Sequence, residues 1–139
     1  MTTREQVRTA LVNKIEALKS TFSTYTLLVE YDNLVTVNRA TQSNPFLCVT
    51  IVYQDGYQID LAANPSHRVL GTIVIEANVK EGSGTSRANL LLEHFYPSIH
   101  MKDNLPPLRT YAAKFASRSA KDGWAVQAAL IPFWYDSMP

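Results

Sequence analysis

Apolar residues near the N-terminus recur at steps of three and four, which is the spacing of one face of an α-helix. Thr3 and Gln6 have the spacing of a capping box, in which each residue caps the backbone of the other. The pattern predicts a first helix from about residue 3 to residue 19, with a charged face turned to solvent. The apolar positions that define it are Val7, Leu11, Ile15, Leu18 and Phe22.

Alternating and β-branched segments after this helix predict strands. Residues 26–31 are expected to form a short strand that ends at the turn-forming pair Asp32-Asn33. Residues 46–53 alternate between two faces, and Gln54-Asp55-Gly56 predicts a hairpin turn into a short return strand over residues 57–61. Residues 68–80 alternate over the longest stretch of the chain and predict a central strand.

The C-terminal half predicts one more helix and two more strands. The helix is expected from about residue 87 to residue 95, entered through a glycine-rich turn at 81–86 and ended by Pro97. The strands are expected over residues 108–119 and 123–135, joined at the hairpin signal Lys121-Asp122-Gly123. This order predicts a single α+β domain over residues 1–139. We expect a largely antiparallel sheet of about five to six strands, with the N-terminal helix and a second helix packed on it.

Composition narrows the class of protein. A chain of 139 residues is one ordinary domain and buries enough surface to fold without disulfides, and its single cysteine, Cys48, forms none within the chain. Its 13 Lys and Arg against 12 Asp and Glu leave a net charge of +1, which argues against nucleic-acid binding. No apolar run reaches the ~20 residues that span a bilayer, and the N-terminus lacks the apolar stretch of a secretory signal. We expect a protein of the reducing cytoplasm without a membrane partner.

No group of side chains has the spacing of an active site or a metal site. Cys48 and the three histidines lie on separate predicted elements, without a Cys-x-x-Cys or a paired-histidine spacing. The run Gly82-Ser83-Gly84 enters a helix but lacks the lysine and the further glycine of phosphate-binding loops. We therefore expect no catalytic residue, no metal and no cofactor, and we expect that the protein is not an enzyme.

Two polar segments and one aromatic residue are the candidates for contacts with other molecules. The connection over residues 33–45 is long for a compact domain, and the turn over 81–86 is rich in glycine and hydroxyl side chains. Alternation on the last strand places Phe133 and Tyr135 on one face and Trp134 on the other. Trp134 is then either an interface residue or covered by a second layer. The candidate interface residues are Asn38, Arg39, Thr41, Gln42, Ser83, Thr85 and Trp134.

Several local strings, taken in order, resemble a known family. They are VEYDN at 29–33, PFLCV at 45–49, RVLGTIVI at 68–75, GSG at 82–84, GW at 123–124 and IPFWYD at 131–136. In this order the chain is similar to small bacteriophage and prophage proteins of the tail-terminator-like family, which includes tail-completion proteins. The resemblance spans nearly the whole chain and is carried by the order of the strings, since each string alone is a common strand or turn pattern.

The resemblance implies a structural role. Proteins of this family cap the growing tail tube as a ring, often six-fold, fix its length and offer a surface to head-completion proteins. The implied partners are further copies of this chain in a hexamer-like ring, the tail tube protein and a head-completion protein. The implied location is the virion tail, with assembly in the host cytoplasm. Because a ring needs contacts between two different patches, we expect segments 33–45 and 81–86 to be contact or tube-facing segments that order only on assembly.

A second class of function is compatible with the same residues. A small α+β module that binds a ligand or a partner without catalysis would use the same loop and aromatic residues around an apolar pocket. A small molecule that raises the melting temperature would favour this alternative. An enzyme is a third hypothesis, and it requires Cys48 or a histidine with a perturbed pKa in a cleft.

Overall fold

The fold is α+β with two α-helices, as the sequence predicts. The computed structural model describes residues 3–32, 34–58, 67–101, 108–121 and 123–137. In chain order the elements are α1 (Arg4–Ser20), β1 (Val29–Tyr31), β2 (Phe46–Gln58), β3 (His67–Lys80), α2 (Ser86–Phe95), the short 3-10 helix η1 (Tyr96–Ser98), β4 (Arg109–Thr110), β5 (Lys114–Lys121) and β6 (Trp124–Ser137).

The strands of the described residues form one mixed sheet. Its order is β1-β2-β3-β6-β4, and β5 pairs with the first half of β6 on the same side as β4. β1 runs parallel to β2, whereas every other pairing is antiparallel. The sheet is therefore largely antiparallel, as expected, and β1 is the exception: a parallel neighbour needs a long connection, and the predicted loop at residues 33–45 lies between β1 and β2.

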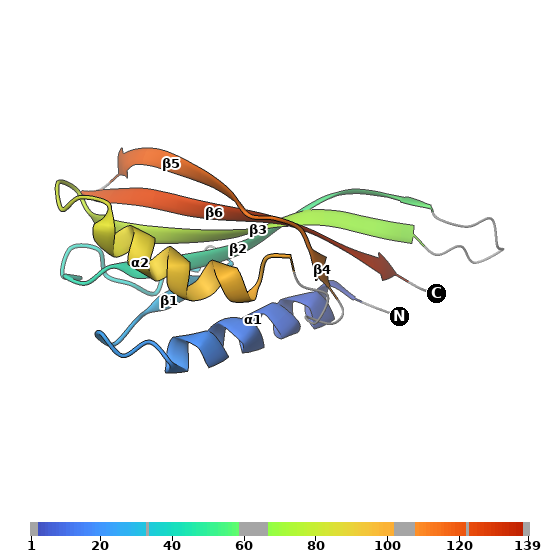
Figure 1. Cartoon of the computed structure of the whole chain (residues 1–139), viewed down its shortest axis with the longest axis horizontal. Helices are drawn as coiled ribbons and strands as arrows, with labels where there is room; N and C mark the ends of the chain where they lie inside the picture. The colour runs from blue at the N-terminus through green and yellow to red at the C-terminus, as the bar shows by residue number, and fades with distance from the viewer. Residues whose placement is uncertain (1–2, 33, 59–66, 102–107, 122, 138–139) are drawn as a thin grey trace.

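Both α-helices cover the same face of the sheet, and the hydrophobic core lies between them and the strands (Figure 1). The helix α1 begins at the predicted capping box, where the Thr3 side chain accepts the Gln6 N–H and the Gln6 side chain accepts the Thr3 N–H. Three residues of α1 at helical spacing are buried against the sheet, which confirms the periodicity of the sequence. They are Val7, Leu11 and Ile15.

The predicted turn at Gln54-Asp55-Gly56 is wrong, because β2 continues through it to Gln58. The register between β2 and β3 shifts between Gln54 and Tyr57, so the segment is a bulge within a strand. A side chain at Gly56 would collide with the main-chain carbonyl of Arg68, so this glycine permits close backbone approach and not a turn. The expected return strand is wrong for residues 57–58, and residues 59–61 lie outside the described part.

The predicted strand over residues 108–119 is interrupted at residues 111–113, which separate β4 from β5. Pro132 of β6 lies opposite the break and has no N–H to donate to a neighbouring strand. Near the break, the Ala113 N–H donates to the Nδ1 atom of His100 and not to a neighbouring strand. The following hairpin is confirmed, since Lys121 pairs with Trp124.

Candidate interaction surfaces

A buried carboxylate in β1 holds the loop that follows it. The side chain of Glu30 is 4% exposed. Its Oε2 atom accepts the main-chain N–H groups of Thr36 at 2.7 Å and Val37 at 2.8 Å. Its Oε1 atom accepts a hydrogen bond from the guanidinium of Arg39 at 2.7 Å, which makes an ion pair. Glu30 therefore fixes the first half of the loop to the sheet, and we call this set of contacts the Glu30 clasp.

The environment of the Glu30 clasp sets the protonation of its two titratable groups. Burial favours the neutral carboxyl, but the hydrogen bonds from Arg39, the Val37 and Thr36 N–H groups and Cys48 outweigh it and lower the pKa of Glu30 to about 2. Burial and the hydrogen bond to Glu30 raise the pKa of the Cys48 thiol to about 12. Glu30 is thus an anion at neutral pH, whereas Cys48 is a neutral thiol and a poor nucleophile.

The same loop also packs on the sheet face that the helices leave uncovered. Val37 lies in a small buried cluster with Phe46 and Trp124. The indole Nε1–H of Trp124 donates to the Arg39 carbonyl at 3.3 Å. The Arg39 guanidinium lies 5.0 Å from the centre of the Phe46 ring. Residues 36–39 are therefore anchored within the single chain, which argues against the expectation that this part of the loop orders only on assembly.

The predicted loop residues have different surroundings. Asn38 forms a local turn, in which its side-chain oxygen accepts the Ala40 N–H and its carbonyl accepts the N–H groups of Thr41 and Gln42. Asn38 and Thr41 are exposed, whereas Arg39 and Gln42 are half-buried. Asn38 and Thr41 are consequently the candidate residues of this loop that present their side chains to solvent.

The turn at residues 81–86 lies at the same end of the sheet as the loop. The Arg87 guanidinium donates to the Asn44 side chain at 3.3 Å, and the Glu81 N–H donates to the Gly123 carbonyl at 2.8 Å. Ser83 and Thr85 are exposed, and the turn enters α2 without a side-chain cap from Thr85. The structure thus gathers six of the seven candidate residues at one end, which we call the loop end.

Trp134 lies at the other end of the sheet. It occupies the face away from the helices and is half-buried, whereas Phe133 and Tyr135 are in the core, as alternation predicts. Arginines flank its ring: the guanidinium carbon of Arg68 lies 3.8 Å and that of Arg109 5.3 Å from the ring centre. Cation–π contacts of this kind shield the ring from solvent. The sequence left open whether a second layer covers Trp134, and it is these arginine side chains that cover it in part.

An open hollow of about 440 Å³ lies beside Trp134 and Arg109. Tyr111, 53% exposed, forms part of its wall. Arg68 donates two hydrogen bonds to the Asp136 carboxylate, at 2.8 and 3.1 Å, which neutralise that pair. An aromatic wall with a guanidinium beside it suits an aromatic or acidic segment of a partner.

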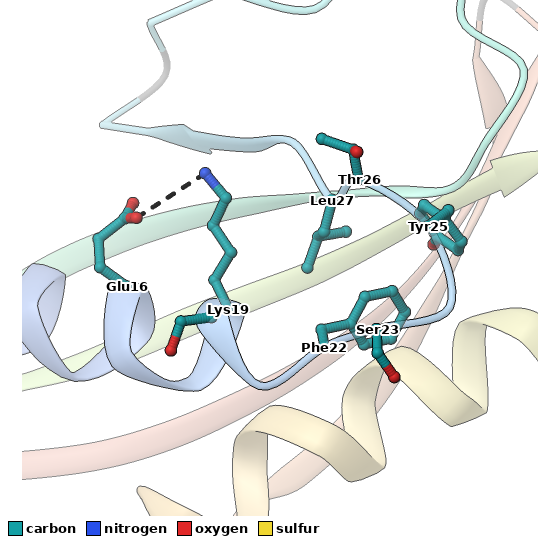
Figure 2. A pocket seen from close by; sticks show the side chains of 8 residues that line it. Glu16, Lys19, Phe22, Ser23, Tyr25, Thr26 and Leu27 are labelled. Atoms are coloured by element: carbon teal, nitrogen blue, oxygen red, sulfur yellow. Dashed lines mark ion pairs between the residues drawn. The ribbon is translucent and has the colours of Figure 1, made fainter.

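The linker between α1 and β1 lines another open hollow, of about 510 Å³ (Figure 2). Its charges are paired with each other: Lys19 Nζ lies 3.7 Å from Glu16 Oε2, and the Tyr31 hydroxyl donates to Glu16 Oε1 at 2.7 Å. Figure 2 shows Glu16 and Lys19 on the helix, across from Thr26 and Leu27. Because Glu16 and Lys19 pair with each other, neither charged side chain of the lining is left unpaired for a ligand.

The cysteine and histidines considered from the sequence do not converge. Cys48 bonds to Glu30 and Asn78 on the face away from the helices. His94 bonds to the Leu18 carbonyl, and His100 accepts the Ala113 N–H. Among the described residues no group of three or more His, Cys, Asp or Glu side chains is placed to hold a metal ion. No helix of that part of the chain is both long enough and apolar enough to cross a membrane.

The Glu30 clasp is the part of this surface that the sequence did not reveal. Its one signal is a carboxylate in an otherwise apolar and aromatic strand, within the string TLLVEY at residues 26–31. A lone acid in such a strand has to be exposed or paired, and the partners come from residues six to nine positions further on, where no pattern marks them.

Comparison with known proteins establishes the fold but no family. No family model matches the chain, and no curated protein matches it. Solved structures share its architecture. One of them, a protein named only by an identifier, covers 100% of this chain and 99% of its own length, with a TM-score of 0.70 and 14% sequence identity. At this sequence identity the similarity shows a shared fold: the other protein has the same α+β fold over nearly its whole length.

Proposed function

We propose that this chain is a phage or prophage structural protein, a tail terminator or tail-completion protein that caps the tail tube as a ring. The proposal starts from the resemblance of its ordered strings to the tail-terminator-like family. In the α+β fold those strings fall on β1, on β2, on β3, on the turn before α2 and on both ends of β6. The ring would meet the tail tube protein on one side and a head-completion protein on the other.

The observation that carries the proposal is the loop end. Two polar segments separated by 35 residues in sequence meet there. The hydrogen bond from Arg87, next to the second segment, to Asn44 joins them, and the Glu30 clasp fixes the first. A ring subunit needs an axial surface that is separate from its contacts with neighbours. The loop end supplies such a surface, with Asn38, Thr41 and Ser83 turned to solvent.

Deletion of the gene tests the proposal. Tails are measured by electron microscopy in particles induced from the parent prophage, with the deleted strain complemented by the wild-type gene as the control. The proposal predicts overlong tails or tubes without heads in the deleted strain and normal tails in the complemented strain. Normal, head-attached tails in the deleted strain would refute it.

The second candidate is a small binding module, and one hollow favours it. A space of about 250 Å³ lies between the α1–β1 linker and α2, lined by Phe22, Tyr25, Arg87 and Leu90 among others. Apolar and aromatic walls with one cation are common features of small-ligand sites. A small acid that raises the melting temperature of the wild-type protein but not of an Arg87→Ala variant would establish this function.

A further inference from the structure

The outer edge of β2 is unpaired over most of its length. β1 pairs with Leu47, Cys48 and Val49 only. From Thr50 to Gln58, no strand of the described part of the chain lies on the side of β2 away from β3. The outward N–H and C=O groups of this stretch therefore have the geometry of a template for another strand.

The opposite side of the sheet has a second free edge. β5 pairs with β6, and within the described residues no strand pairs with the other side of β5. Figure 1 shows β5 and β2 on opposite sides of β6 and β3. One sheet thus carries two open edges, which face away from each other.

Exposed apolar side chains follow these two edges. Of the nine large apolar residues that are exposed in the described part, eight lie along the edges and one, Leu90, lies on α2. Those on the β1–β2 side are Leu28, Leu34, Val35, Val52 and Tyr57, and those on the β4–β5 side are Met101, Tyr111 and Phe115. Such a distribution marks both edges as contact surfaces.

We propose that the outer edge of β5 in one copy pairs with residues 50–58 of β2 in the next copy, which makes one sheet continuous between subunits. The closing of this contact into a ring rests on the proposed function. Charge disfavours the pairing of two β5 edges. The β5 sequence KFASRSAK carries three cations and no anion, so two β5 edges repel each other. Residues 50–58 carry one anion and no cation.

Strand direction agrees with this pairing. β2, β3, β6 and β5 are successively antiparallel, so a β2 strand that follows β5 continues the same alternation. Across the sheet, Ala116 pairs with Ala128, Ala128 with Glu76, and Glu76 with Cys48. β5 therefore lies at the same level as the start of β2. Placing Ala116 opposite Gln54 of the next copy keeps residues 114–120 clear of the stretch of β2 that β1 occupies. It also keeps Ala116 and Gln54 on the face away from the helices and shifts that copy by six residues along the strand.

That shift has the size that a closed barrel needs. Six residues span about 20 Å, and four strands side by side span about 19 Å. The strands are then tilted by about 45° to the ring axis, at the upper end of the range of roughly 35–45° that closed barrels adopt. A heterologous contact gives a ring when the rotation between successive copies closes, and an open filament when it does not.

Cross-linking of the concentrated, purified full-length protein tests the contact. The background is Cys48→Ser, which keeps a hydroxyl for Glu30, and Ala116→Cys and Gln54→Cys are added singly and together. With a short bis-maleimide, a mixture of the two single variants is expected to give covalent dimers, and each single variant alone is not. The double variant is expected to give a ladder that ends at a closed oligomer. Dimers from Ala116→Cys alone, or none from the mixture, would overturn the proposal.

A charged residue on the edge provides the second test. Phe115→Glu in the cross-linking mixture is expected to lower the dimer yield by at least about tenfold, since it replaces an exposed apolar side chain of the edge with a charge and adds an anion to the contact with a β2 edge that carries one. Leu90→Glu, at a similarly exposed site on α2, is the matched control and is expected to leave the yield unchanged. Equal yields in both variants would contradict the edge contact.

The outcomes separate the edge contact from the tail function. Cross-links in the purified protein together with normal tails in the deleted strain would retain the edge contact and refute the tail function. Overlong tails in the deleted strain without cross-links in the purified protein would refute the edge contact and retain the tail function.

Discussion

Replacing Glu30 with glutamine tests whether the Glu30 clasp holds the loop. The change keeps the size of the side chain but removes its charge. Oε2 accepts two main-chain N–H groups and Nη1 of Arg39, and Oε1 accepts from Nη2 of Arg39 and from Cys48, so each of these partners is a donor. A glutamine offers one acceptor, and its NH₂ group would face donors on the other side. Arg39 would also lose its carboxylate while only 29% exposed.

The pKa of Glu30 gives the magnitude. Its value is about 2 in the folded protein against an ordinary 4.5, a difference worth about 3 kcal/mol in the free energy of unfolding. This agrees with the cost of about 3–5 kcal/mol for breaking a buried ion pair from one side. Because the folded pKa is the lower one, the stabilisation is complete above pH 4.5 and is lost as the pH falls toward 2.

Urea unfolding at pH 7 and at pH 3 measures both effects. Glu30→Gln is expected to lower the free energy of unfolding by about 3 kcal/mol at pH 7 and to lose less stability than the wild type between the two pH values. Glu5→Gln is the control: its side chain is 75% exposed, so a change within about 0.5 kcal/mol is expected. Equal stability of Glu30→Gln and wild type at pH 7 would refute the role of the clasp.

Three further predictions concern packing and reactivity. Gly71→Ala is expected to lower the free energy of unfolding by about 1–3 kcal/mol in urea, because its methyl group would collide with the Phe133 ring; unchanged stability would contradict this packing. Cys48 is expected to react with an aromatic disulfide at pH 8 roughly a thousandfold more slowly in the folded than in the urea-unfolded protein, since its pKa is raised to about 12. Trp134→Ala is expected to cost about 1–2 kcal/mol in the same urea assay through the lost contact with Arg68, and a stability equal to wild type would show that the stacking contributes nothing.

The elements with long periodic patterns could be predicted from the sequence. Both helices begin and end within a residue or two of the expected positions, and β3 was expected as the central strand. These segments could be predicted because buried apolar residues recur on one face many times along each of them. Gly56 and Pro132 show the limit: the same residues that mark turns also permit a bulge or a break in an edge strand, and only the neighbouring strand decides which.

The candidate surface could be predicted in part. The polarity of residues 33–45 and 81–86 pointed to a surface, but not to their meeting at one end of the sheet, which depends on tertiary contacts such as Arg87 with Asn44. The partners of Glu30 were equally hidden, because a hydrogen bond to a main-chain N–H leaves no mark on residue type. The pairing of Trp134 with two arginines comes from strands far apart in sequence.

Cryo-electron microscopy of completed tails from the parent prophage tests the proposed function most directly. We expect a ring at the head-proximal end of the tube whose subunits fit this α+β fold, with Asn38, Thr41 and Ser83 of the loop end facing along the tail axis. Tails of normal length whose head-proximal end contains no copy of this chain would contradict it.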